Sequence, residues 1–275
     1  MSPRPVALGD RENERTTIPV IDNDLYDRLA DTWWDERGFL NLLRTVINPW
    51  RLPYFQRVLS QQRVDPTTSH ALDVGCGGGL LAEEFAAMGF SVTGIDPSRE
   101  SLSVAGAHAL QNGLHIDYRF GHGAALPFEN ESFEIVYCCD VLEHIRNWDA
   151  VIAEIARVLK PNGLFFYDTI NRTLFSKVVI VKLMQEWRLT RMTPPNLHVW
   201  EMFIKPTELV ESLERNGLRN LDLSGLKLAT PVTLLVALVQ YRRGRISAAE
   251  LGKRIGAREG ANLNVSYIGY AWRAA

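Results

Sequence analysis

Short apolar runs bounded by turn residues recur through the middle of the chain and alternate with longer amphipathic segments. The short runs predict buried strands, and the segments with apolar residues three and four apart predict helices. The predicted strands are 71–74, 91–95, 117–120, 133–138 and 163–168. Helices are predicted at 80–88 and 148–159. Strands that alternate with helices form a largely parallel sheet covered on both faces, so the pattern predicts an α/β fold.

The segments on either side of this core have a different pattern. Residues 19–62 predict amphipathic helices that carry several aromatic side chains. After the core, an apolar insertion at 173–206 and a second insertion at 229–263 lie on either side of a strand near 221–223. The last strand, at 264–272, is expected to join the sheet antiparallel. We therefore expect a mostly parallel sheet of seven strands.

These elements predict one folded domain over 19–275, preceded by a polar and charged tail at 1–18 that we expect to be disordered. The expected parts of the domain are a helical cap (19–65), a core (66–172), the first insertion (173–206) and a C-terminal part (207–275) that contains the second insertion.

Composition and charge argue against several classes of function. The chain has 275 residues, is 46% hydrophobic and 23% charged, and carries a net charge of −2, so no bulk attraction to nucleic acid is expected. No segment reaches the ~18 apolar residues that span a bilayer, and the first residues lack the apolar core of a signal peptide. Three cysteines form neither a disulfide framework nor a zinc spacing, which favours a reducing, cytoplasmic environment. The sequence does not indicate an oligomeric state.

The most informative segment is a glycine-rich turn between the first predicted strand and the first predicted helix. Gly75 and three consecutive glycines, 77–79, let the backbone turn tightly and approach a ligand closely. Asp96 ends the next strand, close to the ~20 residues after the turn at which an acid accepts hydrogen bonds from ribose hydroxyls. The pattern predicts a nucleotide-type ligand, and the glycines alone leave an NAD-dependent dehydrogenase open.

Further motifs decide between these ligands by resemblance. The string LDVGCGGG at 72–79 resembles motif I of the class I S-adenosylmethionine-dependent methyltransferases. The segments LPF at 126–128 and SFEIV at 132–136 resemble the approach to that family's fourth strand. The segment RVLKPNG at 157–163 is similar to its LKPGG turn, with Asn162 where glycine is commoner. A dehydrogenase predicts no such turn. The resemblance implies a Rossmann-like class I fold and S-adenosylmethionine as co-substrate.

A second set of motifs is similar to the ubiquinone-biosynthesis O-methyltransferases, which methylate phenolic hydroxyls on polyprenylated rings. The resemblance covers about residues 24–226, and it rests on WWD at 33–35, INPWRL at 47–52, VLEH at 141–144, TINR at 169–172 and FIKP at 203–206. It implies methylation of a phenolic or enolic hydroxyl on a hydrophobic small molecule, with a prenylated quinol precursor as the first guess. The alternatives are an acceptor from secondary metabolism, and a non-catalytic cofactor-binding interaction protein, which would predict a damaged glycine turn or a lost acid.

The resemblance also implies cofactor contacts. The candidate cofactor-binding residues are Arg51, Asp73, Gly75, Gly77, Gly79, Asp96, Pro97 and Cys139. The planar guanidinium of Arg51 suits the carboxylate of S-adenosylmethionine, and the alternative is a surface salt bridge. Cys139 is expected to pack near the adenine without thiol chemistry. His122 stands where many relatives have an acid, so its role is open.

The candidate catalytic residues follow the fourth strand, at the sheet edge where α/β proteins bind ligands. Spacings of three and four place Asp140, Glu143 and His144 on one face if this turn is helical. Two carboxylates and an imidazole suit Mg²⁺ or Mn²⁺, and the resembling family carries an E-x-x-E-H metal site here. The alternative is a structural turn in which His144 is a base without a metal. His198 is a second candidate base, and Glu143 completes the catalytic candidates.

The first insertion combines apolar side chains with lysines and arginines along its edges. Such a segment can cover an apolar acceptor, lie on a membrane surface, or bury its apolar face in the core. We expect 173–206 to form a mobile helical lid over the acceptor pocket, with peripheral contact to the membrane in which a prenylated substrate resides.

Overall fold

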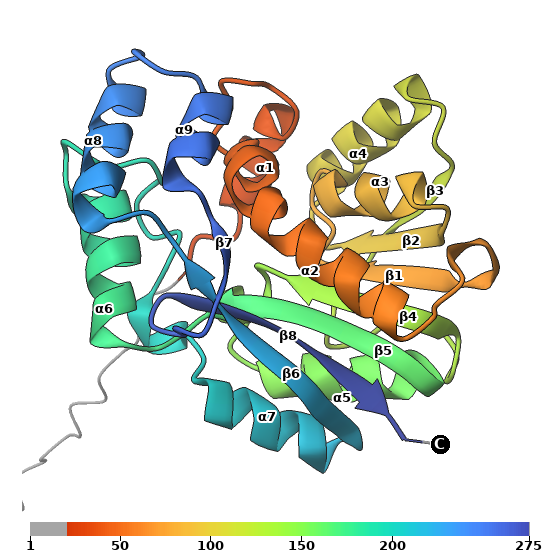
Figure 1. Ribbon diagram of the computed structural model, residues 1–275. Coiled ribbons are helices and arrows are strands. Elements are labelled where there is room, and N and C mark those ends of the chain that lie inside the picture. The colour runs from red at the N-terminus through yellow and green to blue at the C-terminus, as the bar shows by residue number, and fades with distance from the viewer. Residues whose placement is uncertain (1–20, 275) are drawn as a thin grey trace, which may run out of the picture.

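A computed structural model describes residues 21–274, so the predicted disordered tail at 1–18 lies outside the described residues. Its central feature is a single sheet with the strand order β3-β2-β1-β4-β5-β8-β6-β7 (Figure 1). The strands are β1 His70–Val74, β2 Ser91–Asp96, β3 Ile116–Phe120, β4 Phe133–Cys139, β5 Leu159–Ile170, β6 Leu218–Lys227, β7 Arg258–Gly260 and β8 Ser266–Arg273.

The five strands predicted for the core are all present and all parallel. Strand β1 lies between β2 and β4, with Leu72 opposite both Thr93 and Val136. Strand β8 pairs antiparallel with β5, as predicted for the last strand. The strand order reverses between β1 and β4, and the carboxyl ends of strands at such a point form the ligand-binding edge of an open α/β sheet.

The sheet has one strand more than the seven predicted. The additional strand, β7, comes from the second insertion and pairs with β6 through Gly225 and Gly260. An ion pair of 2.8 Å between Arg57 on helix α2 (Asn48–Gln61) and Glu259 ties this three-residue strand to the body of the molecule. A short edge strand has few apolar residues, so the hydrophobic pattern gives little sign of it.

The helices cover both faces of the sheet. The α-helices are α1 Leu25–Arg28, α2 Asn48–Gln61, α3 Leu80–Ala87, α4 Arg99–Gln111, α5 Trp148–Val158, α6 Leu174–Ser176, α7 Pro206–Arg215, α8 Pro231–Arg242 and α9 Ala248–Ile255. The 3₁₀ helices are η1 Ala30–Thr32, η3 Pro66–Thr68, η4 Leu142–His144 and η6 Trp200–Met202, and the π-helices are η2 Leu43–Ile47 and η5 Lys177–Glu186.

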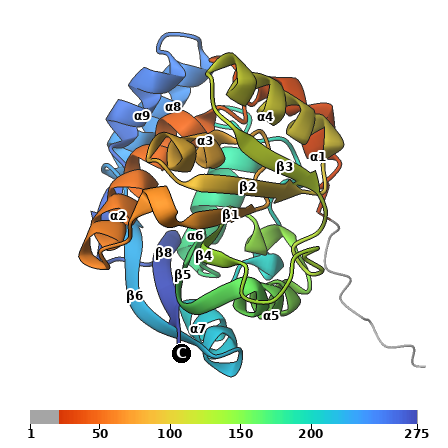
Figure 2. The same cartoon turned by 90° about the vertical axis from the view of Figure 1, so that its right-hand side faces the viewer.

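Two apolar cores lie on opposite faces of the sheet because successive side chains of a strand point to opposite sides. Phe165 of β5 packs with the residues of α5 and α7, and its neighbour Phe166 packs with those of α2 and α3. On the second face, the Phe85 ring stacks on Tyr137 with 4.1 Å between ring centroids. Helices α5 and α7 lie on one side of the sheet, and the α8–α9 hairpin lies at the opposite end of the molecule in both views (Figures 1 and 2).

One residue of the core sheet has an unusual backbone conformation. Asn162, which replaces the commoner glycine, lies within β5 and has a φ of +65°. Asparagine tolerates this left-handed conformation better than most residues, so the substitution fits the backbone at this position. Among residues 21–274, no helix is both long enough and apolar enough to cross a membrane.

Candidate functional site

The glycine turn lies at the carboxyl end of β1 and is held against β2. The backbone N–H groups of Gly75 and Cys76 both donate to the Ile95 carbonyl, at 2.8 and 3.1 Å. Gly75 and Gly77 have φ values of +79° and +49°, which residues other than glycine rarely adopt. A Cβ on Gly75 would lie 2.4 Å from Val141 Cγ2, so both backbone angle and space require glycine there.

The two tryptophans of the WWD motif explain why the next glycines are needed. A Cβ on Gly77 or Gly78 would lie 2.4 or 2.2 Å from the Trp33 side chain. Trp33 Nε1 donates to Ser101 Oγ at 3.0 Å, and Trp34 Nε1 donates to the Gly78 carbonyl at 2.8 Å. The N-terminal cap therefore packs directly on the glycine turn. From the sequence, Trp33 and Trp34 were expected as aromatic anchors of the N-terminal segment and as part of a family signature, and their contact with the glycine turn was not predicted.

Asp96 ends β2 beside this turn and is almost fully buried. Its carboxylate accepts hydrogen bonds from the backbone N–H groups of Gly77 and Ser98, both at 2.8 Å. Burial raises the pKa of Asp96, and the two hydrogen bonds lower it. The carboxylate therefore fixes the glycine turn in addition to the ribose contact predicted for it, and Pro97 continues the same wall.

Arg51 of α2 lies in a buried cluster of charges and not in a surface salt bridge. Its guanidinium contacts Asp168 through Nε at 2.7 Å, pairs with Asp140, and donates to Asn48 Oδ1 at 3.2 Å. Burial disfavours the charge, but the two aspartates raise the pKa of Arg51 well above its ordinary value. Asp168 was not predicted as a site residue. It lies inside an apolar strand, and Arg51, which binds it, is 117 residues away in the sequence.

The cysteine and the aspartate predicted to contact the cofactor are also placed at this edge. Asp73 of β1 is buried, and burial together with Asp96 raises its pKa well above the ordinary value. Burial and the nearby Asp168 raise the pKa of the Cys139 thiol. A protonated thiol fits the expectation that Cys139 contributes packing and not nucleophilic chemistry.

Two histidines from distant segments lie next to each other in the lining of one cavity. His144 of η4 and His198 have ring centroids 5.4 Å apart, and Tyr26 Oη lies 3.4 Å from His144 Nε2. Burial lowers the pKa of His144 to about 4 and that of His198 to about 3, so both imidazoles are neutral at neutral pH. The Nδ1 atoms of both rings are buried and have no hydrogen-bond partner within the described chain. From the sequence, Tyr26 was expected only as one of the aromatic anchors of residues 19–62, with no role at the site.

The predicted metal ligands do not come together. Glu143 is 1% exposed and accepts a hydrogen bond of 2.8 Å from Thr169 Oγ1, whereas Asp140 pairs with Arg51. In the chain from 21 to 274, no three histidine, cysteine or carboxylate side chains form a group that could hold a metal ion. The helical spacing fails because η4 begins only at Leu142, and Asp140 before it has a φ of +55°. The arrangement seen here therefore does not fit the predicted Mg²⁺ or Mn²⁺.

A cavity of about 890 Å³ joins these parts. Its lining includes Arg51, Asp73, Gly75, Gly77, Asp96, Pro97, Cys139, Asp140, His144 and His198. Two predicted site residues are not part of the lining, because Gly79 faces Tyr118 and Glu143 faces Thr169. The lining also contains many apolar side chains, which come from η2, η5, α8 and α9 among other segments. The cavity can hold a nucleotide-type ligand at the glycine turn and an apolar molecule beside it.

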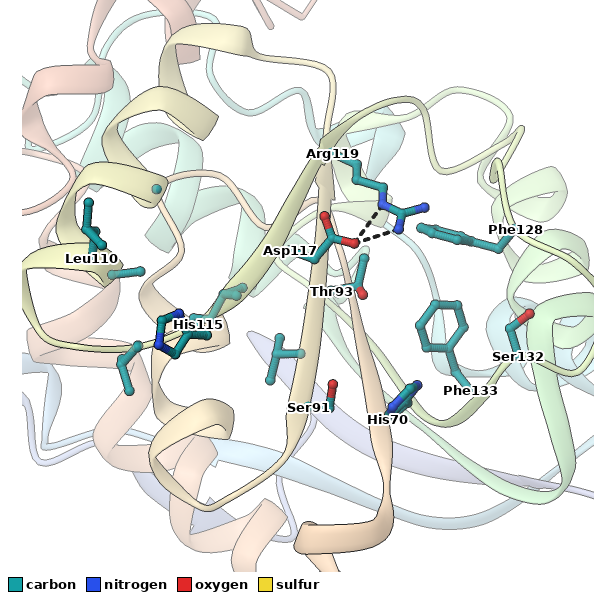
Figure 3. A pocket seen from close by; sticks show the side chains of 15 residues that line it. His70, Ser91, Thr93, Leu110, His115, Asp117, Arg119, Phe128, Ser132 and Phe133 are labelled. Atoms are coloured by element: carbon teal, nitrogen blue, oxygen red, sulfur yellow. Dashed lines mark hydrogen bonds and ion pairs between the residues drawn. The ribbon is translucent and has the colours of Figure 1, made fainter.

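A second hollow of about 720 Å³ lies at the amino ends of the strands and shares no lining residue with the large cavity. It extends from His70 and Ser91 to an exposed ion pair between Asp117 and Arg119 (Figure 3). The amino edge is opposite to the one at which open α/β sheets bind ligands. We assign it no role.

Comparisons with known proteins agree with this geometry. Residues 72–167 match the model of a methyltransferase domain family. The chain is 39% identical over 212 residues to a ubiquinone biosynthesis O-methyltransferase from Pasteurella multocida, a match that covers 74% of this chain and 85% of that protein. A protein of the same name from Sinorhizobium fredii is 36% identical over 222 residues, covering 78% and 88%.

Solved structures give the fold. A crystal structure of an S-adenosylmethionine-dependent methyltransferase from Aquifex aeolicus superposes with a TM-score of 0.54 at 15% identity, covering 90% of this chain and 97% of the other. At that identity the likeness shows a shared Rossmann-like fold and no more. The relatives at higher identity decide the family. The chain belongs to the ubiquinone biosynthesis O-methyltransferases, a family of enzymes with S-adenosylmethionine as methyl donor.

Proposed function

We propose that this enzyme methylates a phenolic or enolic hydroxyl on a hydrophobic ring, with a prenylated quinol precursor as the first candidate. The names of the relatives support the reaction and the acceptor class. The single observation that carries the proposal is that two neutral histidines, His144 and His198, line the same cavity as the glycine turn and a set of apolar side chains. An acceptor hydroxyl would meet a proton acceptor at that place.

The residues at the sheet edge would hold the methyl donor. The Asp96 carboxylate would accept hydrogen bonds from the ribose hydroxyls while it keeps the turn in place. The glycines leave room for close approach of the ligand, and Arg51 would bind its carboxylate. Because Arg51 already contacts Asp140 and Asp168, we propose that the donor's carboxylate shares or replaces the Asp140 contact.

The chemical step requires of the protein only that it orient the reactants and remove one proton. S-adenosylmethionine supplies a methyl group activated on a sulfonium, which moves to the acceptor oxygen as its bond to sulfur breaks. Orientation of the two reactants contributes up to about 7–11 kcal/mol in favourable cases. A phenol titrates near ~10, so a base is useful, and we assign the proton to neutral His144 with His198 as the second candidate.

A direct test uses the purified enzyme, S-adenosylmethionine and catechols that carry an apolar substituent. We expect a methyl ether and S-adenosylhomocysteine in equal amounts by mass spectrometry. His144→Ala should lower kcat by about 10²–10⁴, the usual contribution of a general base, and leave the affinity for S-adenosylhomocysteine near that of the wild type. Binding of S-adenosylhomocysteine without methylation of any phenolic or enolic acceptor would overturn the reaction.

The divalent cation stays a prediction that the geometry does not support. Asp140 would have to leave Arg51, and Glu143 would have to leave Thr169, before both carboxylates could reach one ion. Turnover after exhaustive EDTA treatment, followed by addition of Mg²⁺ or Mn²⁺, tests it. Turnover that persists in the chelator leaves His144 as a simple base. Turnover that is lost and then restored would establish the cation and require these two contacts to open.

We also propose that 173–206 acts as a lid. Val179, Ile180 and Met184 of this segment line the cavity, whereas Phe175 and Trp187 are exposed. A segment that lines the pocket on one side and meets solvent on the other is suited to cover an apolar acceptor. Its exposed apolar residues and neighbouring lysines and arginines also suit an anionic membrane surface. Flotation with vesicles that contain anionic lipid distinguishes a membrane-contacting lid from a lid alone.

A further inference from the structure

The second insertion, 229–263, lies beyond the part of the chain that resembles the family, and its role was open. It forms α8 and α9, which pack against each other and against η2 of the N-terminal cap. Apolar side chains of this hairpin contribute to the lining of the large cavity. The insertion is therefore part of the site and not an external addition.

The hairpin is held at a fixed place. A Cβ on Gly252 of α9 would lie 2.1 Å from the Thr45 carbonyl oxygen of η2, so the two helices approach as closely as their backbones allow. Leu251 beside it is fully buried. At the base of the hairpin, the Ala229 N–H donates to the Ile255 carbonyl at 2.8 Å. A wall fixed in this way can define the shape of a pocket.

Helix α8 presents different residues to the cavity and to solvent. Leu234 and Leu238, four residues apart and hence on one side of the helix, line the cavity. Leu235 and Val236 are exposed on another side. Ile255 of α9 extends the apolar lining next to Leu238. One side of α8 thus forms a wall of the cavity, and another side of the same helix is exposed to solvent.

We propose that Leu234, Leu238 and Ile255 form a subsite for the apolar substituent of the acceptor, and that this wall sets the substituent length which the enzyme accepts. The inference rests on the proposed function. The cavity measures about 890 Å³ and must hold the methyl donor as well as the acceptor. Pockets of about 300–1,000 Å³ enclose ligands of drug size, so the remaining space suits a ring with a short apolar arm.

The experiment measures kcat/KM for a series of 4-n-alkylcatechols, from catechol to the dodecyl compound, with S-adenosylmethionine and the full chain. Each methylene that enters an apolar site adds about fourfold in kcat/KM. We expect kcat/KM to rise with chain length and then to stop rising at a cut-off. Leu234→Trp should move the cut-off to shorter chains and lower kcat/KM at the wild-type cut-off by about tenfold relative to catechol.

Leu235→Trp is the matched control, because it makes the same change at the next residue on the exposed side of α8. Its chain-length profile should follow the wild type. Leu238→Ala, which removes volume from the wall, should move the cut-off to longer chains and remains informative if Leu234→Trp does not fold. The melting temperature of each variant shows whether it is folded.

Two kinds of failure are distinguishable. If catechols are methylated but neither Leu234→Trp nor Leu238→Ala changes the cut-off, the subsite is wrong and the proposed function stands. If no member of the series is methylated, the same compounds are titrated into the complex with S-adenosylhomocysteine. If the chain length at which binding stops improving is shorter in Leu234→Trp, the subsite is upheld and the proposed reaction is wrong. If binding depends on chain length in the same way in Leu234→Trp and the wild type, both the subsite and the proposed reaction are wrong.

Discussion

Asp96 has two tasks, and a single substitution separates them. The sequence predicted a ribose contact, and the structure adds the hydrogen bonds that Asp96 accepts from Gly77 and Ser98. We expect Asp96→Ala to weaken binding of S-adenosylhomocysteine by about 3–6 kcal/mol, because two hydrogen bonds to a charged group contribute about 1.5–3 kcal/mol each. Isothermal titration calorimetry measures this loss, and unchanged affinity would contradict the assignment of the glycine turn.

The same substitution leaves two buried N–H groups without an acceptor. Each unsatisfied donor costs about 1–3 kcal/mol, so the free energy of unfolding of Asp96→Ala should also fall. Urea denaturation measures that loss separately from ligand binding. A variant that loses affinity but keeps full stability would show that the two N–H groups find other acceptors.

Glu143 makes the stability of the protein depend on pH. Burial, and next the charge of Asp140, raise its pKa to about 8, whereas the carboxyl of an unfolded chain titrates near 4.5. A group whose pKa is raised on folding favours the folded state while it is protonated, so this contribution is lost as the pH rises from about 4.5 to 8.

Glu143→Gln tests this sign. Glutamine keeps an oxygen that can accept the Thr169 hydrogen bond but does not titrate. We expect the free energy of unfolding of Glu143→Gln, relative to the wild type, to increase as the pH rises from 4.5 to 8. Urea denaturation at several pH values gives the difference, which removes the contributions of the other titrating groups. A difference that does not change with pH would mean that Glu143 is ionised in the folded protein.

At the scale of elements, residues far apart in the chain decide the site. The core strands were predictable because most of them are local apolar runs and β3 alternates apolar and charged residues, and the order of strand, glycine turn and helix is local as well. The Trp33 contact with Gly78 and the pair of His144 with His198 join separate segments, and no local pattern indicates them. The predicted metal ligands lie apart for a local reason, since one turn of 3₁₀ helix does not provide the assumed helical spacing.

The contact between the N-terminal cap and the glycine turn can be tested with a matched pair of substitutions. Gly78→Ala would place a Cβ 2.2 Å from the Trp33 side chain, whereas a Cβ at Gly106 in α4 meets nothing within 4 Å. We expect Gly78→Ala to lower the free energy of unfolding by about 1–3 kcal/mol, the usual cost of overpacking. Gly106→Ala should raise it by about 0.5–1 kcal/mol, because alanine favours a helix.

Thermal and urea denaturation of both variants provide the comparison. Binding of S-adenosylhomocysteine should weaken only in Gly78→Ala, since displacement of Trp33 disturbs the turn. Equal effects of the two substitutions on stability would show that the cap does not pack on the turn as described.

At the scale of the whole molecule, the cavity is built from parts that the sequence analysis treated as separate additions. The N-terminal cap, the first insertion and the second insertion all contribute to its lining, around the edge of a sheet whose strands alone were clear from the pattern. The fold class followed from local periodicity. The size and apolar character of the acceptor site follow from packing among these additions, which depends on their arrangement in three dimensions.

Opening and closing of residues 173–206 would change the molecule at this scale. If 173–206 opens to admit the acceptor, limited proteolysis should cut it in the free enzyme and spare it when S-adenosylhomocysteine and an acceptor are both bound.

Met184 lines the cavity and Trp187 is 58% exposed, so the two faces of this segment can be tested separately. We expect Met184→Ala to raise the acceptor KM severalfold, because the lost apolar contacts are worth about 0.8 kcal/mol for each methylene. Trp187→Ala should leave KM unchanged and weaken binding to anionic vesicles if the outer face meets a membrane. Equal resistance to protease in both states, together with an unchanged KM in Met184→Ala, would mean that the segment is a fixed wall and not a lid.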